Sequence, residues 1–226
     1  MCGRYALDEN ARELANHFGL IAVPELTPRY NIAPGTPVPV IRDSPAGPVM
    51  EPMVWGLTPA WARRTPAPSS MPKPINARSE TVADKPMFRE AFRRRRCILP
   101  ASGFYEWLRP ASGAKQPYYI HPVTEPVFAM AGLYEDGDGE HPPSCCILTV
   151  SANEVMTPIH DRMPVMLAGP DLARWLAPGS PRDAVAPLLI PAPAATMTAH
   201  RVGTRVNSAR NDGPELILPA PSDAGP

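Results

Sequence analysis

Apolar side chains recur along the chain at two spacings, which predict a few short helices and many short strands. A first helix is predicted to begin after Asp8 as its N-cap and to end at Gly19. The apolar positions of this helix fall on one face: Ala11, Leu14, Ala15 and Phe18. Asp84 and Pro86 are expected to open a second helix with a basic outer side. Its predicted core residues are Met87, Phe88, Ala91 and Phe92, and residues 171–176 predict a third, brief helix.

Short apolar or alternating segments, bounded by turn residues, predict the strands. These segments are 37–42, 50–56, 97–99, 103–107, 117–121, 127–134 and 145–151. Residues 58–74, which include Trp61, are expected to form a proline-rich loop. We find no repeat and no clear linker, so we expect one domain over 1–218 and a frayed tail over 219–226.

Composition narrows the fold class to α+β. The chain of 226 residues contains 33 prolines, which are excluded from helix interiors and central strands. Much of the chain must therefore be loops, turns and short edge segments. The hydrophobic content of 44% and charged content of 19% are typical of a globular protein rather than a disordered one.

Charge is balanced over the whole chain but not along it. The formal net charge is zero, which argues against a generic binder of polyanions. Residues 61–97, however, contain ten Lys or Arg and only three Asp or Glu. Such a segment can line a positive groove for a nucleic acid, or it can simply be the solvated end of a helix around Arg93 to Arg96.

The cysteines indicate neither a disulfide framework nor a metal site. They lie at positions 2, 97, 145 and 146, and adjacent strand residues such as Cys145 and Cys146 point to opposite faces. None has zinc-ligand spacing, so we expect no metal and no cofactor. No signal peptide and no run of about 18 apolar residues is present, so we expect a cytoplasmic protein without a membrane partner.

Cys2 offers unusual chemistry if the initiator methionine is removed. A terminal cysteine carries a thiol and an α-amine, and with a pKa near 8 roughly one-tenth of the amine is neutral at pH 7. The amine can attack an aldehyde to give a Schiff base, and the thiol can then close a five-membered thiazolidine ring. Taken alone, Cys2 is better interpreted as simply an early residue near a strand.

Three further positions carry candidate chemistry. His160 lies between two prolines in a stiff loop, where it could act as a general acid or base or be an ordinary surface histidine. Glu106 shares a strand face with Phe104, which indicates a desolvated acid, although a half-solvated edge carboxylate fits as well. Asn76 and Arg78 share a face of an extended segment and could orient a carbonyl and a phosphate, or serve a turn.

Seven motifs occur in one order along the chain. They are residues 2–5 (CGRY), 29–34 (RYNIAP), 55–57 (WGL), 76–81 (NARSET), 103–107 (GFYEW), 160–164 (HDRMP) and 211–217 (NDGPELI). This ordered set, which spans the chain from Cys2 to about Leu218, resembles the SRAP family (SOS-response-associated peptidase domain). Members of that family shield abasic sites in single-stranded DNA by covalent crosslinking.

The resemblance implies a fold and a set of roles. The fold would be a single α+β domain with a curved, barrel-like, mainly antiparallel sheet flanked by a few short helices and a positive groove. Cys2 would be the nucleophile, Asn76 would position it, and Glu106 and His160 would move protons. The implied DNA-binding residues are Arg4, Asn31, Trp61, Arg78, Trp107 and Arg162. The implied partner is single-stranded DNA containing abasic sites. The protein would be a monomer, associated with the nucleoid when it is bound to DNA, and would have a lyase side activity.

Two other functions remain open at this stage. Cys2 could attack a carbonyl as a thiol peptidase or N-terminal-nucleophile amidase that removes its own Met1, which requires the thiol but not the amine. Alternatively, the chain could be a noncatalytic module that binds single-stranded DNA through residues 61–97.

Overall fold

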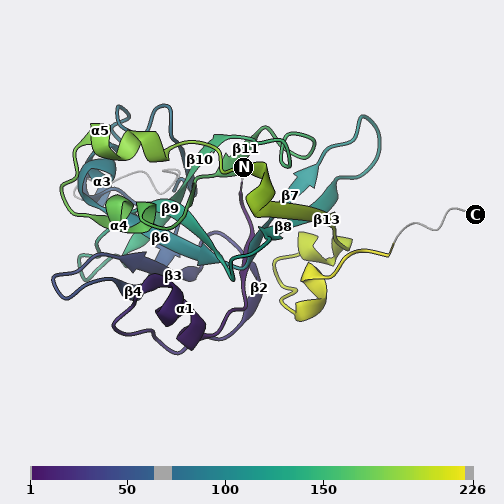
Figure 1. The fold of residues 1–226 in the computed structure, drawn as a ribbon, viewed down its shortest axis with the longest axis horizontal. Helices are drawn as coiled ribbons and strands as arrows, with labels where there is room; N and C mark the ends of the chain where they lie inside the picture. Colours follow the sequence, from purple (N-terminus) through teal and green to yellow (C-terminus); the bar gives the residue numbers. More distant parts are fainter. Residues whose placement is uncertain (1, 64–72, 222–226) are drawn as a thin grey trace, which may run out of the picture.

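The computed structural model describes residues 2–63 and 73–221, whose strands form two sheets (Figure 1). The first sheet has the order β13-β8-β7-β1-β2 and is antiparallel throughout. Its strands are β1 (Tyr5–Leu7), β2 (Arg29–Ile32), β7 (Gly103–Leu108), β8 (Gln116–Pro122) and β13 (Met197–Arg201).

The second sheet has eight strands, and five of them close into a ring. Strand β10 pairs with β4, followed by β3, β6 and β9, and β9 pairs again with β10. The strands of this sheet are β3 (Pro37–Arg42), β4 (Val49–Trp55), β5 (Asn76–Arg78), β6 (Arg96–Ala101), β9 (Phe128–Glu135), β10 (Ser144–Ser151), β11 (Arg162–Pro164) and β12 (Met166–Leu167). The pairs of β10 with β4 and β5 are parallel and the others are antiparallel. The expected α+β, mainly antiparallel fold is confirmed.

Short helices cover the outside of the sheets. They are α1 (Ala11–Phe18), α2 (Ala60–Arg63), α3 (Arg89–Arg94), α4 (Asp171–Leu176) and α5 (Arg182–Val185). Figure 1 shows α3, α4 and α5 gathered at one end of the eight-stranded sheet. Four 3-10 turns complete the described elements: Ala186–Leu188, Ala194–Thr196, Thr204–Asn207 and Pro214–Ile217. The last two lie beside β8 and β13 in Figure 1.

Strand β7 separates two hydrophobic cores because its side chains alternate between them. Phe104 belongs to the main core, which fills the space between the two sheets and under the helices. Tyr105 belongs to a smaller core that the C-terminal segment closes, with Ala6, Tyr119, Val202, Val206 and Leu216. The alternation predicted for 103–107 is therefore confirmed, and it directs Glu106 to the same side as Phe104.

Several predicted boundaries were wrong for local reasons. The cap of α1 is Asn10 rather than Asp8, because the Asn10 side chain accepts a hydrogen bond from the Glu13 amide at 2.9 Å. The predicted stop at Gly19 is confirmed, with φ of 61°. The expected loop 58–74 contains helix α2, and its residues 64–72 lie outside the described residues.

The basic run before Cys97 does not simply face solvent. Arg93 and Arg94 are exposed and pair with Glu90, but Arg96 is only 4% exposed. Its guanidinium donates to the backbone carbonyls of Phe92, Arg93, Trp175 and Ala177. Arg96 therefore joins α3 to the end of α4. Beyond residue 218, the Ala220 amide donates to the Arg201 carbonyl, while residues 222–226 lie outside the described part.

Candidate functional site

Cys2 lies three residues before the first residue of β1, and the β1–β7 register places it near the C-terminal end of β7. The pairing of Tyr5 with Phe104 and of Ala6 with Gly103, continued by two residues along each strand, places Gly3 opposite Glu106. The Tyr105 amide donates to the Arg4 carbonyl at 2.9 Å, which extends this pairing beyond the assigned strand. Cys2 is fully buried and Glu106 is 4% exposed. The pairing of β1 with β7 thus brings the thiol and the carboxylate into one buried region.

Asn76 joins this region from the other sheet. Its side-chain Nδ2 donates to the backbone carbonyl of Cys2 at 2.8 Å. Strand β5 is held in place by its parallel pairing with β10 and by Trp55, whose Nε1 donates to the Ile75 carbonyl at 2.9 Å. The Asn76 Oδ1 atom is buried, and among the described residues it accepts no hydrogen bond. Asn76 therefore orients Cys2 and still has an acceptor to offer.

The environment of Cys2 keeps its sulfur protonated. Burial raises the pKa of the thiol well above its ordinary value, and the nearby Glu106 charge raises it further. The thiol also donates a weak hydrogen bond to the Arg4 carbonyl at 3.9 Å, which requires the proton on sulfur. At neutral pH the sulfur is a thiol rather than a thiolate.

His160 lies in the turn that leads into β11. Its backbone amide donates to the Met156 carbonyl at 2.8 Å. Its Nδ1 is 3.0 Å from the Arg162 backbone N–H and 2.9 Å from the Asp161 carboxylate. One protonation state cannot make both contacts, because the amide needs a lone pair on Nδ1 and the carboxylate needs a proton there. Asp161 is 86% exposed, so water can replace its contact with the ring. The hydrogen bond from the Arg162 N–H to Nδ1 then belongs to the neutral ring, which carries its proton on Nε2.

Arg162 crosses β10 and binds Glu80. Its two terminal nitrogens lie 2.5 and 2.9 Å from the two Glu80 carboxylate oxygens. Its Nη2 also donates to the Thr149 carbonyl at 2.6 Å. The Arg162 side chain is 13% exposed, and this pairing lowers the pKa of Glu80 to about 2. Glu80 and Thr149 were not among the predicted site residues.

Arg4, Asn31 and Trp107 form a second group next to Cys2. Arg4 donates to Asn31 Oδ1 at 2.7 Å and lies 6.0 Å from the centre of the Trp107 ring. Trp107 donates from Nε1 to Asn207 at 2.7 Å. The Asn31 amide donates to three carbonyls of the C-terminal segment, those of Val206, Ser208 and Asn211. Asn31 therefore fastens this segment to β2 and is 3% exposed.

The two remaining predicted DNA contacts are exposed. Arg78 follows Asn76 by two residues on β5, and within the described residues its guanidinium has no hydrogen bond or ion pair. Trp61 is 52% exposed on α2. It lines a shallow pocket with Met87, Glu90 and Glu135, which contains none of the other predicted site residues.

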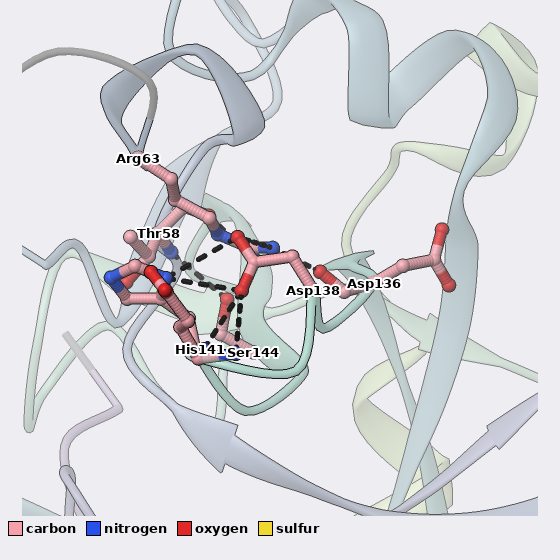
Figure 2. A network of polar contacts seen from close by, with 7 residues as sticks. Thr58, Arg63, Asp136, Asp138, His141 and Ser144 are labelled. Atoms are coloured by element: carbon pink, nitrogen blue, oxygen red, sulfur yellow. Dashed lines mark hydrogen bonds and ion pairs between the residues drawn. The ribbon is translucent and has the colours of Figure 1, made fainter.

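Helix α2 is fixed by a separate polar network, drawn in Figure 2. Arg63 donates to the carbonyls of Thr58 and Asp136 and pairs with Asp138 at 3.7 Å. Asp138 in turn accepts from the His141 amide at 2.8 Å. This network ties α2 to the turn between β9 and β10, which sets the position of Trp61.

Comparison with known proteins decides the family. The family model described as SOS response associated peptidase (SRAP) matches residues 1–209. The chain belongs to the SRAP family. This SRAP protein is 38% identical to the abasic site processing protein YoqW of Bacillus subtilis over 224 residues, which cover 96% of the chain and 99% of YoqW. It is 30% identical to the abasic site processing protein YedK of Escherichia coli, over 97% of the chain and all of YedK.

A relative from a vertebrate and a solved structure extend the comparison. The abasic site processing protein HMCES of Xenopus tropicalis is 36% identical over 84% of this chain and 65% of its own length. A crystal structure of a Bacteroides thetaiotaomicron protein matches with a TM-score of 0.85 and 27% identity, over 97% of this chain and all of that one. The fold described above is therefore shared with that Bacteroides thetaiotaomicron protein.

Two further properties concern the described residues alone. They contain no group of three or more His, Cys, Asp or Glu side chains arranged to hold a metal ion. None of their helices is long and apolar enough to cross a membrane.

Proposed function

We propose that this SRAP protein forms a covalent thiazolidine crosslink between mature Cys2 and an abasic site in single-stranded DNA. The observation that carries the proposal is the hydrogen bond from Asn76 to the Cys2 carbonyl, beside a buried thiol and Glu106. A fixed Cys2 presents its amine and its thiol to the same carbon, which intramolecular ring closure requires. The names of YoqW, YedK and HMCES as abasic site processing proteins support the same substrate.

The reaction proceeds in three steps. The closed deoxyribose opens to its aldehyde as the bond from C1′ to the ring oxygen breaks, and the Glu106 carboxylate takes the proton of the C1′ hydroxyl and donates it to the ring oxygen. The Cys2 amine attacks C1′ and forms a carbinolamine. Its hydroxyl takes up one proton from solvent and leaves as water, while the Nε2–H of His160 donates a hydrogen bond to the departing oxygen, and an iminium ion remains. The Cys2 sulfur then bonds to C1′, the C=N π electrons return to nitrogen, and the thiol proton is released.

The raised pKa of the Cys2 thiol supports this order of events. A protonated sulfur does not compete with the amine for the aldehyde, so the imine forms first. An imine also acidifies C2′, so elimination of the 3′ phosphate is the competing lyase reaction. Closure of the thiazolidine removes the imine and protects the strand. Because the proposed substrate is single-stranded DNA, the proposed location is the cytoplasm and its nucleoid.

The same property disfavours a thiol peptidase. A cysteine peptidase needs a thiolate, which a neighbouring cation or base stabilises, whereas burial and Glu106 both destabilise the thiolate of Cys2. The peptidase alternative predicts cleavage of peptide or amide substrates by protein with a blocked α-amine. The crosslinking proposal predicts no product from that protein.

Denaturing gel electrophoresis tests the proposal. Mature protein is incubated with an oligonucleotide that carries one abasic site, and a retarded band that survives denaturation is expected. The Cys2→Ser protein keeps the amine and should form a band only when borohydride reduces the imine. Protein with an acetylated N-terminus should form no band under either condition. Absence of any band from folded, mature wild-type protein, with or without borohydride, would overturn the proposal.

A further inference from the structure

We infer that Glu80 is a positioning residue that acts through Arg162 to hold the ring of His160 in one tautomer. This inference rests on the proposed function only for its effect on the crosslinking rate. The tautomer itself can be measured without DNA. Glu80 makes none of the contacts with Cys2 described above, so it would act on the reaction through the residues that it binds.

The first link is the pairing of Glu80 with Arg162. Both carboxylate oxygens are engaged, at 2.5 and 2.9 Å, in the two-bond geometry that fixes the plane of a guanidinium. Thr149 holds the same guanidinium from its carbonyl at 2.6 Å and from its hydroxyl at 3.4 Å. Arg162 is thus bound across β10, between β11 and the segment that follows β5.

The second link runs through the backbone of Arg162. Its N–H donates to His160 Nδ1 at 3.0 Å, so Nδ1 must carry a lone pair and Nε2 must carry the proton. Asp161 offers Nδ1 a competing partner, but only when that nitrogen is protonated. Fixing the position of the Arg162 N–H therefore selects the neutral ring with its proton on Nε2.

The side chain and the backbone of Arg162 are coupled by the short length of the element. Strand β11 has only three residues, Arg162–Pro164, and Arg162 is its first. Its pairing with Ser151 is the last in the register with β10, and beyond it a single backbone hydrogen bond remains, from the Ala152 amide to the Asp161 carbonyl at 3.0 Å. A strand end this short is prone to fray unless a side chain secures it. Glu80 and Thr149 supply that restraint.

The pairing also competes with phosphate for Arg162. Both terminal nitrogens of its guanidinium bind Glu80, whereas exposed Arg78 is free of such a pair within the described residues. Removal of the Glu80 charge should thus have two opposite effects. Crosslinking should slow because His160 loses its orientation, while DNA binding should stay equal or become tighter because one negative charge is lost.

Single-turnover crosslinking separates the two effects. The rate at saturating abasic DNA and the half-saturating DNA concentration are measured for wild type, Glu80→Gln and Glu80→Asp. For Glu80→Gln we expect a rate about tenfold lower at saturation with an unchanged or lower half-saturating concentration. Glu80→Asp, which keeps the charge, should recover part of the rate. Glu90→Gln is the matched control, because Glu90 is similarly exposed and also pairs with arginines, Arg93 and Arg94.

A double variant tests whether the effect passes through His160. In a His160→Gln background, Glu80→Gln should change the rate by less than twofold, because the positioned ring is already absent. A full tenfold effect in that background would overturn the inference, as would an unchanged rate in Glu80→Gln alone. A higher half-saturating concentration would instead assign Glu80 to DNA binding and would also overturn it.

Nitrogen NMR of the histidine ring gives a readout independent of DNA. Wild-type His160 at neutral pH should show a protonated Nε2 and an unprotonated Nδ1. Glu80→Gln should shift this pattern toward a mixture of tautomers, with no shift in Glu90→Gln. If the wild type forms no crosslink, the proposed function fails, yet this spectrum still decides whether Glu80 sets the ring. An unaltered His160 signal in Glu80→Gln would contradict the inference.

Discussion

Single polar side chains join segments that are distant in the sequence. Asn76 joins β5 to the start of the chain through the Cys2 carbonyl, and Asn31 joins β2 to the C-terminal segment. Asn76 donates to one backbone carbonyl and Asn31 to three, and both side chains lie in mostly buried places. At this scale, removal of one amide should change the position of a whole segment rather than one contact.

The first prediction concerns Asn76. Asn76→Ala removes the bond to the Cys2 carbonyl, and the loss of one such bond, about 1–2 kcal/mol, corresponds to a crosslinking rate lower by roughly 5- to 30-fold. The rate of band formation on denaturing gels at saturating abasic DNA measures it. Asn10→Ala is the control, since it removes the cap of α1 and costs about 1 kcal/mol of stability without touching Cys2. Equal rates for Asn76→Ala and wild type would show that Asn76 does not orient Cys2.

The second prediction concerns stability. Arg96 is buried and donates to four backbone carbonyls, including those of Trp175 and Ala177. Arg96→Lys keeps the charge but cannot make the same set of bonds, and it should lower the free energy of unfolding by about 2–4 kcal/mol. Urea denaturation followed by tryptophan fluorescence measures this change. Arg93→Lys, at an exposed position of the same run, should stay within about 0.5 kcal/mol of wild type.

Local patterns were sufficient to predict some single-residue features but not others. The alternation of 103–107 correctly put Glu106 on the side of Phe104, and the glycine at position 19 correctly ended α1. The pair of Glu80 and Arg162 could not be predicted, because the partners are 82 residues apart and no spacing rule connects them. Glu80 does belong to the motif of residues 76–81, and this membership was the sequence feature that could have indicated a functional role for it.

At the scale of elements, the agreement with prediction depends on how much each segment buries. Strand β3 and helix α4 have the predicted bounds, Pro37–Arg42 and Asp171–Leu176, because each carries a clear apolar pattern. Strand β13 (Met197–Arg201) was not predicted, since it is an edge strand with a single buried residue. Strands β1 and β11 have three residues each, too few to show a period, and pairing with neighbours alone defines them.

The third prediction uses the ion pair that joins β11 to the segment after β5. The hydrogen bond from Arg162 lowers the folded-state pKa of Glu80 from its ordinary 4.5 to about 2. The stabilisation is therefore fully present above pH 4.5 and is lost as the pH falls through about 2. Glu80 is half-exposed, so solvent screens the effect and it should be modest. Melting temperatures between pH 5 and pH 2 should fall less steeply in Glu80→Gln than in wild type, and parallel curves would contradict the assignment.

At the scale of the whole molecule, the proposed binding of DNA by a chain with zero net charge requires an uneven distribution of its charges. Ion pairs occupy many of its arginines, as with Arg162 and Glu80 or Arg42 and Glu51. An arginine without such a partner can bind a phosphate and release its counterion without first breaking an ion pair within the protein. The number of phosphate contacts should therefore be much smaller than the number of basic residues.

The fourth prediction follows for Arg78, which lies two residues beyond Asn76 and has no ion pair within the described residues. With a single-stranded oligonucleotide that lacks an abasic site, the logarithm of the binding constant should fall linearly with the logarithm of salt concentration. Loss of one phosphate contact in Arg78→Ala should reduce the magnitude of this slope by about 0.7 and weaken binding equally for different base sequences. Fluorescence anisotropy between low and moderate salt gives both quantities. Arg174→Ala, on α4 and paired with Asp171, should keep the wild-type slope. If Arg78→Ala also keeps it, the strand does not pass over β5, and the phosphates must follow the side of Arg4 and Trp107 instead.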